Sequence, residues 1–110
     1  MFKFVEILKK GAMKMNRKKL IYSILKELEQ GNEPKQKDYE LDLEQWGEIA
    51  ELIRDEGYAK GIGVQYADAT VYYVSFDSAK IAMKGIEFLE ENSALSKTYR
   101  GIKEVIGWLK

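Results

Sequence analysis

The chain contains no cysteine and no histidine among its 110 residues. These absences exclude disulfide frameworks, zinc fingers, iron–sulfur clusters, cysteine nucleophiles and imidazole acid–base chemistry. No apolar run approaches the roughly 20 residues that a membrane-spanning helix needs. Lys3 and Glu6 also interrupt the opening segment, where a signal peptide would have its apolar core. The sequence therefore predicts a soluble cytoplasmic protein with no cofactor, no metal and no membrane partner.

The chain also has no net charge, because its 18 Lys and Arg residues balance its 18 Asp and Glu residues. With 45% apolar residues, the chain can build one folded core and is too apolar for disorder. The charges are nevertheless unevenly distributed. Residues 1–26 carry eight basic residues and one acidic residue, whereas residues 34–76 carry four basic and nine acidic ones. Such asymmetry is typical of a basic arm for an anionic partner, and equally of an ordinary solvated helix surface.

Apolar residues at helical spacing predict a long helix that Asn16 caps and Gly31 ends. A shorter segment with helical character precedes it at residues 2–10. Pro34, the only proline, fits the first turn of a short helix at about 34–40. The first half of the chain is therefore predicted to be helical.

A further helix is predicted from Asp42 to the glycine at Gly57. Asp42 is a good N-cap, and Gln45 stands three residues later, as a capping box requires. We expect this helix and the two before it to close a small three-helix core.

Residues 58–66 and 71–76 are rich in β-branched and aromatic side chains and flank a polar tip at 67–70. This pattern predicts a β-hairpin. Gly61 and Gly63 weaken its first strand and predict a bulge or a close backbone approach there.

The second strand of the hairpin is crowded with aromatic residues. Regular alternation would place Tyr72 with Phe76 on one face and Val71 with Tyr73 on the other. One of these faces packs on the helices. We expect the N-terminal or the last helix to cover the other face, with an exposed partner surface as the alternative.

After the hairpin, Asp77 or Ser78 is predicted to cap a helix that ends near Asn92. A last helix then carries apolar residues at spacings of four and three, which suit a partner helix. The residues of this predicted dimer interface are Leu95, Tyr99, Ile102, Ile106 and Leu109. Docking of the same helix onto its own domain is the first expectation, and dimer formation through these residues is the alternative.

This order of elements is that of a winged helix-turn-helix domain, an α+β fold that is mostly α. It has a three-helix core, a two-stranded β-hairpin wing and additional C-terminal helices. We expect a basic, helical N-terminal extension at 1–14 and a single winged-helix domain at 15–110, whose last helix covers 95–109.

Four segments carry a resemblance to a known family: MNRKKLIYSILKE at 15–27, RDEGY at 54–58, KGIEFLEEN at 84–92 and SKTYRGIKE at 96–104. In this order they resemble the YjcQ family of small winged-helix proteins from bacteria and their phages. The resemblance covers residues 15–110. It implies a fold of the DNA-binding type and a prophage context, and it supplies no catalytic or binding residues. Residues 84–89 are also similar to the helix after the wing in MarR-type and PadR-type regulators.

The second helix of a helix-turn-helix enters the major groove of DNA. In this chain that helix would be 42–56, which carries six acidic residues against the single basic residue Arg54. Because DNA affinity rests largely on Lys and Arg that neutralise phosphates, an acidic solvated face is the better interpretation of this helix.

A different surface is better suited to phosphates. Basic residues without an intervening acid lie in and before the start of the first long helix, and the hairpin adds one lysine. The candidates for nucleic-acid or partner binding are Lys9, Lys10, Lys14, Arg17, Lys18, Lys19 and Lys60. This cluster suits DNA phosphates or an acidic protein equally well.

Carboxylate pairs such as Glu48 with Glu51 are too common on surface helices to predict catalysis. We therefore expect a non-enzymatic winged-helix protein of phage or prophage type. The first hypothesis is a DNA-associated transcriptional regulator that binds DNA weakly and tolerates many sequences. The alternative is a protein–protein interaction module that retains the fold without reading the groove. A homodimer through the C-terminal helix fits either hypothesis.

Overall fold

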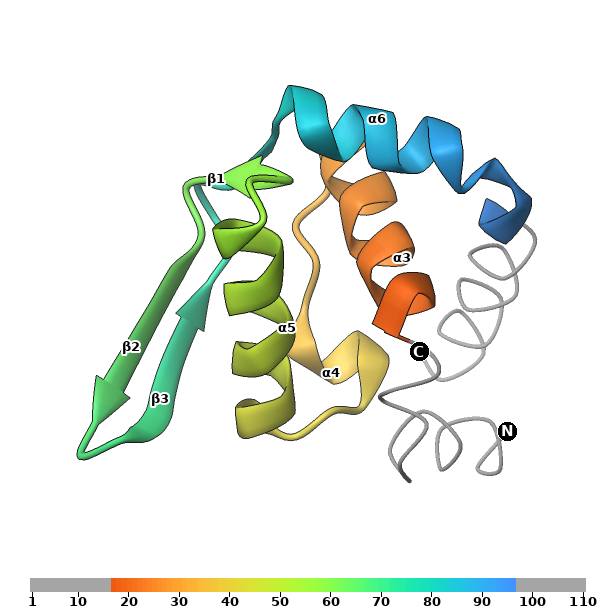
Figure 1. Cartoon of the computed structure of the whole chain (residues 1–110). Helices are drawn as coiled ribbons and strands as arrows, with labels where there is room; N and C mark the ends of the chain where they lie inside the picture. Colours follow the sequence, from red (N-terminus) through yellow and green to blue (C-terminus); the bar gives the residue numbers. More distant parts are fainter. Residues whose placement is uncertain (1–16, 97–110) are drawn as a thin grey trace.

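The computed structural model describes residues 17–96 of the chain (Figure 1). Its elements, in order, are α3 (Arg17–Glu29), α4 (Gln36–Tyr39), α5 (Leu43–Asp55), β1 (Ala59–Lys60), β2 (Gly63–Ala67), β3 (Thr70–Ser75), β4 (Lys80–Ile81), α6 (Met83–Glu91) and the 3-10 helix η1 (Ser93–Leu95). The fold is α+β and mostly helical, as predicted, and the order is consistent with a winged helix. The expected helix at 2–10, the Asn16 cap, and all of the last helix beyond Ser96 lie outside the described residues.

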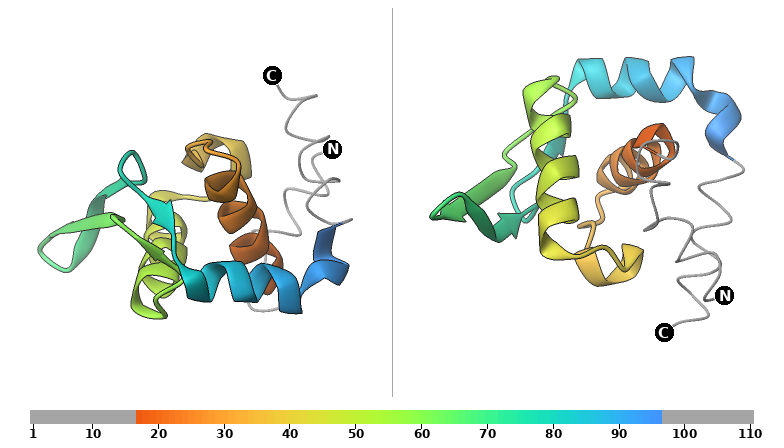
Figure 2. Two further views of the ribbon diagram at one scale, coloured as in Figure 1. Left: turned by 90° about the horizontal axis from the view of Figure 1, so that it is seen from above. Right: turned by 60° about the horizontal axis from the view of Figure 1, so that its bottom comes forward.

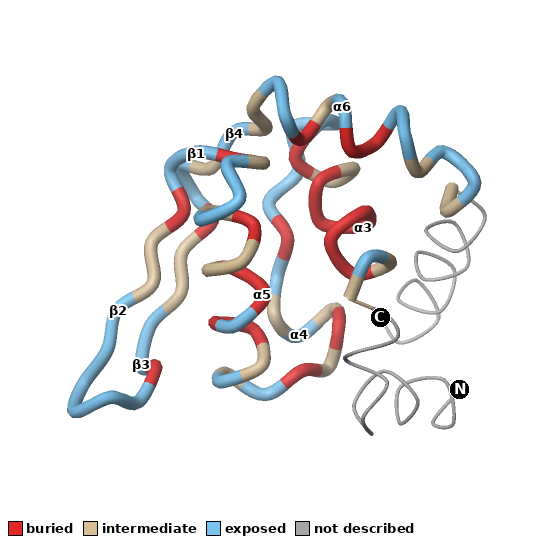
Figure 3. The backbone as a smooth tube through the Cα atoms, viewed as in Figure 1, coloured by how far each residue is buried: buried red, intermediate tan, exposed pale blue. Residues whose placement is uncertain are grey.

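α3 lies at the centre of the described fold, between α5 and α6 (Figures 1 and 2). Every residue from 20 to 25 is buried, so this helix is covered around its whole circumference (Figure 3). The one polar residue within this stretch, Ser23, shares a buried 2.8 Å hydrogen bond with the hydroxyl of Tyr39 in α4. A helix that is buried on all sides is expected at the middle of a core.

α4 and α5 form a helix-turn-helix unit, joined by a short turn in which Glu40 adopts a left-handed conformation with φ of 52°. The predicted capping box is confirmed. The Asp42 carboxylate accepts the Gln45 backbone N–H at 2.8 Å, and the Gln45 side chain accepts the Asp42 N–H at 3.1 Å. These two bonds satisfy donors that the first turn of a helix leaves free, and they fix the start of α5.

Three aromatic rings hold the turn against the hairpin. Tyr39 stacks on Trp46 with 5.5 Å between ring centroids, and Trp46 contacts Phe76 at 5.2 Å. All three side chains are buried. The end of β3 is thereby joined through α5 to α4, although these residues are far apart in the sequence.

The predicted first strand of the hairpin is in fact two strands, β1 and β2, separated at Gly61 and Ile62. Gly61 has φ of 80°, and a Cβ atom there would collide with the carbonyl oxygen of Ser78. The close backbone approach predicted from the glycines is therefore confirmed at Gly61. It leaves two short ladders, β1 with β4 and β2 with β3, in place of one continuous hairpin.

The predicted start of the helix after the hairpin is wrong. Asp77 and Ser78 lie in a turn, and α6 begins only at Met83 with Ala82 as its N-cap. The residues between them form β4, in which Lys80 pairs with Lys60 of β1. Pairing with β1 keeps the chain extended for two more residues, so a good capping residue at 77 or 78 cannot start the helix.

A β-bulge interrupts the pairing of β2 with β3. Gln65 pairs with Tyr73, and the next residue of β2, Tyr66, pairs with Val71. Tyr72 is therefore an extra residue on β3 without a partner on β2. An extra residue shifts the alternation of side chains by one position along the bulged strand.

The bulge makes the predicted division of faces on this strand wrong. Val71 is buried and shares the inner side with Phe76, although regular alternation would place these two residues on opposite faces. Tyr72 and Tyr73 are 56% and 48% exposed. These two exposed tyrosines fit the alternative of an open surface, while the helices expected to cover this face lie outside the described residues.

Gly61→Ala is expected to destabilise the fold much more than Gly31→Ala. Both glycines have nearly the same φ, 80° and 82°, but a Cβ at Gly31 meets nothing within 4 Å. Gly31→Ala should lower the free energy of unfolding by about 1–2 kcal/mol, which is the cost of holding an alanine in the left-handed conformation. Gly61→Ala should cost more than about 3 kcal/mol, because backbone must also move away from Ser78. Urea unfolding of the two variants measures the difference, and equal losses would contradict the close approach.

Candidate functional site

Four carboxylates form one line along α5. They stand at positions i, i+4, i+7 and i+11, so they share one side of the helix. The residues of this acidic stripe are Glu44, Glu48, Glu51 and Asp55. The opposite side of α5 is buried in the core and carries Trp46, Ile49, Ala50 and Ile53. The stripe therefore occupies the side that a helix-turn-helix presents to its ligand.

The first two carboxylates of the acidic stripe are held by other elements. Glu44 accepts the backbone N–H of Val71 in β3 at 2.9 Å. Glu48 forms an ion pair with Arg17 at the start of α3, at 3.3 Å. Both residues of that pair are well exposed, so it contributes little to stability. These two contacts orient the Glu44 and Glu48 carboxylates. They leave most of the negative charge of the stripe in place.

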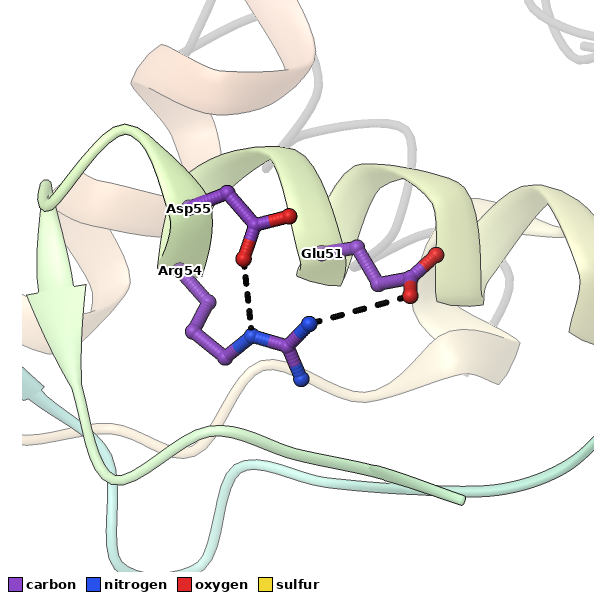
Figure 4. Close-up of polar contacts among 3 residues, drawn as sticks. All are labelled: Glu51, Arg54 and Asp55. Carbon is purple, nitrogen blue, oxygen red and sulfur yellow. Dashed lines mark hydrogen bonds and ion pairs between the residues drawn. The ribbon is translucent and has the colours of Figure 1, made fainter. Parts of the chain in front are cut away.

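Arg54 is the only basic residue of α5, and two carboxylates hold it (Figure 4). Its Nε lies 3.0 Å from Asp55, and its Nη2 lies 3.7 Å from Glu51. The two carboxylates together outweigh the single positive charge of this guanidinium. The surface of α5 is therefore net negative and poorly suited to a nucleic acid.

Tyr66 of β2 joins the same surface from the hairpin. A hydrogen bond to the Glu51 carboxylate raises the pKa of the Tyr66 phenol above its ordinary value. The charges of Glu51 and Glu44 act in the same direction, and Arg54 opposes them. Tyr66 remains 46% exposed, so it presents an aromatic face beside the acidic stripe.

The hairpin lies along α5 because Gly47 has no side chain. A Cβ atom at Gly47 would lie only 2.9 Å from Cγ2 of Val71. In Figures 1 and 2 the hairpin and α3 lie on different sides of α5. The acidic stripe is thus a surface with α5 as its floor and β2 and β3 as one wall.

Of the described basic candidates, Arg17, Lys18 and Lys19 are consecutive at the start of α3, and Lys60 lies apart from them in β1. Arg17 is paired with Glu48, while Lys18 is exposed and Lys19 half-buried at the start of α3. Lys60 faces Lys80 across the β1–β4 ladder. Lys80 lines a hollow of about 500 Å³ together with residues from the C-terminal end of α3, which is the far end of that helix from Arg17. Lys9, Lys10 and Lys14 lie outside the described residues.

The predicted dimer interface is described only at its first residue. Leu95 lies in η1, where it is half-buried and packs against the core of its own domain. Tyr99, Ile102, Ile106 and Leu109 lie outside the described residues. A dimer through this helix stays a prediction.

Sequence reasoning found the acidic face of α5 and missed the contacts that other elements make with it. The spacing of the acidic stripe was available, because positions 44, 48, 51 and 55 share a helical face. The contacts of Tyr66 and Val71 with this stripe were not, because no local pattern reports which strand residue will meet which helix residue. Across residues 17–96, no three acidic side chains form a group that could hold a metal ion. In the same range no helix has the length and apolar character needed to cross a bilayer.

Fold and site together define a small, mostly helical α+β protein whose helix-turn-helix presents carboxylates. The sequence model of the YjcQ family, described as YjcQ protein, matches residues 22–108. The uncharacterized protein YjcQ of Bacillus subtilis (strain 168) is 36% identical over 97 residues, which cover 87% of this chain and 100% of that protein. The chain belongs to the YjcQ family, so the resemblance found in the sequence is confirmed. No solved structure matches it.

Glu51→Gln is expected to lower the pKa of Tyr66 toward its ordinary value, since the variant removes the carboxylate that accepts its hydrogen bond. A raised pKa favours the neutral phenol, so the contact stabilises the fold below pH 10 and is lost as the pH rises through the raised pKa. NMR titration of the Tyr66 ring measures this change. Glu87→Gln on the exposed side of α6 is the control, and an unchanged Tyr66 pKa in Glu51→Gln would contradict the contact.

Proposed function

We propose that this protein is a non-enzymatic, winged-helix-like module that binds another protein through the acidic stripe of α5. The observation that carries the proposal is the position of the stripe on the ligand-facing side of the helix-turn-helix. A surface that a DNA-binding relative would line with Lys and Arg carries four carboxylates here. Its chemistry suits a basic segment of a partner protein.

The charge of the described residues supports the same function. Residues 17–96 contain ten Lys and Arg against sixteen Asp and Glu, a net charge of −6. The whole chain is neutral, because residues 1–16 and 97–110 carry eight basic and two acidic residues, so this −6 is a local excess. A local excess of negative charge around the stripe favours a basic partner segment. Within the stripe, Arg17 and Arg54 offset only part of the four negative charges. Tyr66 adds a ring on which a partner's arginine can stack.

Neutralisation of two exposed charges of the stripe is expected to weaken partner binding about tenfold, at roughly 0.7 kcal/mol for each exposed pair. The change is the double variant Glu48→Gln with Asp55→Asn in the full chain. Proteins retained by immobilised wild-type and variant chains are quantified by mass spectrometry after nuclease treatment.

The matched control is Glu87→Gln with Glu90→Gln, which removes the same number of charges from exposed positions of α6. Partners that depend on the stripe are lost from the first variant and kept by the control. Equal retention by both variants would contradict the proposal, as would a wild-type sample that retains no protein.

The second candidate function is a DNA-associated regulator, which the charge of the chain ends favours. Residues 1–16 carry four Lys against one Glu, and residues 97–110 carry four basic residues against one Glu. Lys18 and Lys19 continue the basic run into α3 and pair with no carboxylate among the described residues. Phosphate contacts of this kind need no groove-reading helix.

For this candidate we expect duplex DNA of any sequence to bind weakly at about 50 mM salt and to dissociate steeply as salt rises. Fluorescence anisotropy measures the salt dependence. Changing Lys9, Lys10, Lys14, Lys18 and Lys19 to Gln should abolish binding, while Arg17 is kept because it pairs with Glu48. Absence of binding to any duplex at about 50 mM salt would contradict DNA association.

A further inference from the structure

The two edges of the β2–β3 hairpin differ in how they are protected. Ala67 and Thr70 flank the two-residue turn at Asp68 and Ala69, both of which have positive φ. Residues that flank such a turn bond to each other, so the next pair, Tyr66 and Val71, directs its backbone amides outward. The hairpin therefore offers outward donors and acceptors on both strands.

The outer edge of β3 is closed. Its outward amide at Val71 donates to Glu44 of α5, so that position has no free donor. One residue later the bulge at Tyr72 breaks the regular spacing of the strand. Both features are devices by which proteins prevent a further strand from pairing with an edge.

The outer edge of β2 lacks these devices. Its five residues, Gly63–Ala67, include no charge, no proline and no bulged residue. By alternation from Tyr66, the amide of Val64 also points outward. Within residues 17–96 the outward amides of Val64 and Tyr66 have no hydrogen-bond partner. An uncharged open edge of this kind pairs readily with another strand.

The sequence of β2 is complementary to itself in antiparallel register. A two-fold axis at Gln65 places Val64 opposite Tyr66 of a second copy, and both residues have the outward amides that such a pair requires. A β-branched residue opposite an aromatic one is a favourable cross-strand pair. The Gln65 amide already accepts the Tyr72 hydroxyl at 2.8 Å, and its NH₂ group remains able to donate to Gln65 of the second copy.

Charge is compatible with a second copy as the occupant. The whole chain carries 18 basic and 18 acidic residues, so its net charge does not oppose the association of two copies. Residues 61–67 contain no charged side chain, and this edge therefore permits close approach. An isologous contact of this kind closes on itself as a dimer with two-fold symmetry.

We infer that the protein forms a homodimer by antiparallel pairing of β2 with β2 of a second copy, which builds a four-stranded sheet in the order β3–β2–β2–β3. This interface goes beyond the partner binding proposed for the acidic stripe. A pair of five-residue strands buries less than the roughly 1,200 Å² of a stable interface, so the dimer is weak and depends on concentration.

The first test is sedimentation equilibrium of the full chain from about 10 μM to about 1 mM, a range that spans the affinities of small interfaces. The average mass is expected to rise from 12.7 kDa toward twice that value. Gln65→Lys places two like charges across the axis and should weaken the dimer more than tenfold. Thr70→Lys, on the opposite edge of the hairpin, is the matched control and should dimerise as the wild type does.

The second test uses the absence of cysteine from the chain. Residues opposed across such an axis have Cα atoms about 4.5 Å apart, within the range of a disulfide. Gln65→Cys should therefore oxidise to a covalent dimer much faster than Thr70→Cys, whose two copies would lie about 20 Å apart, three strand spacings across the sheet and four residues along it. Circular dichroism melting verifies that each variant is folded.

Three outcomes overturn the inference. One is a monomer mass across the whole concentration range. Another is a Gln65→Lys variant that is folded and dimerises as the wild type does, which would place the dimer on another surface such as the C-terminal helix. The third is equal oxidation rates for Gln65→Cys and Thr70→Cys.

Discussion

The contact between Gly47 of α5 and Val71 of β3 decides the shape of the functional surface. Any side chain at position 47 would meet the Val71 methyl groups, so the hairpin can lie against α5 only where the helix has a glycine. This contact also requires the bulge at Tyr72, because the bulge turns the Val71 side chain toward the helix. With Val71 in place, its backbone N–H reaches Glu44 and the hairpin is fixed beside the acidic stripe.

Repulsion among the carboxylates of the acidic stripe destabilises α5, and contacts with neighbouring groups offset this repulsion. Like charges three and four residues apart destabilise a helix by a few tenths of a kcal/mol for each pair. Arg17, Arg54 and the Val71 N–H each give a carboxylate one favourable contact. The stripe is therefore compatible with the fold, and its remaining charge faces outward. This outward charge is the feature on which the proposed binding of a basic partner rests.

The two proposed surfaces are adjacent but chemically distinct. The stripe lies on α5 and is charged, whereas the free edge of β2 is uncharged and offers backbone amides. Tyr66 belongs to both, since its phenol lies beside Glu51 and its amide lies on the free edge. Pairing of two copies through β2 would place two acidic stripes in one particle. Such a dimer binds a partner with two basic segments more tightly than a single stripe can.

The sequence by itself determined the features that depend on neighbours along the chain. The Asp42–Gln45 capping box, the end of α5 at Gly57 and the helical face shared by Glu44, Glu48, Glu51 and Asp55 all follow from fixed local spacing. Only the tertiary structure decided which residues meet across elements. The pairing of Lys80 with Lys60 delays α6 to Met83, and the bulge at Tyr72 reverses the face of Val71. Pairing register depends on contacts between distant segments, and local propensity carries no information about those contacts.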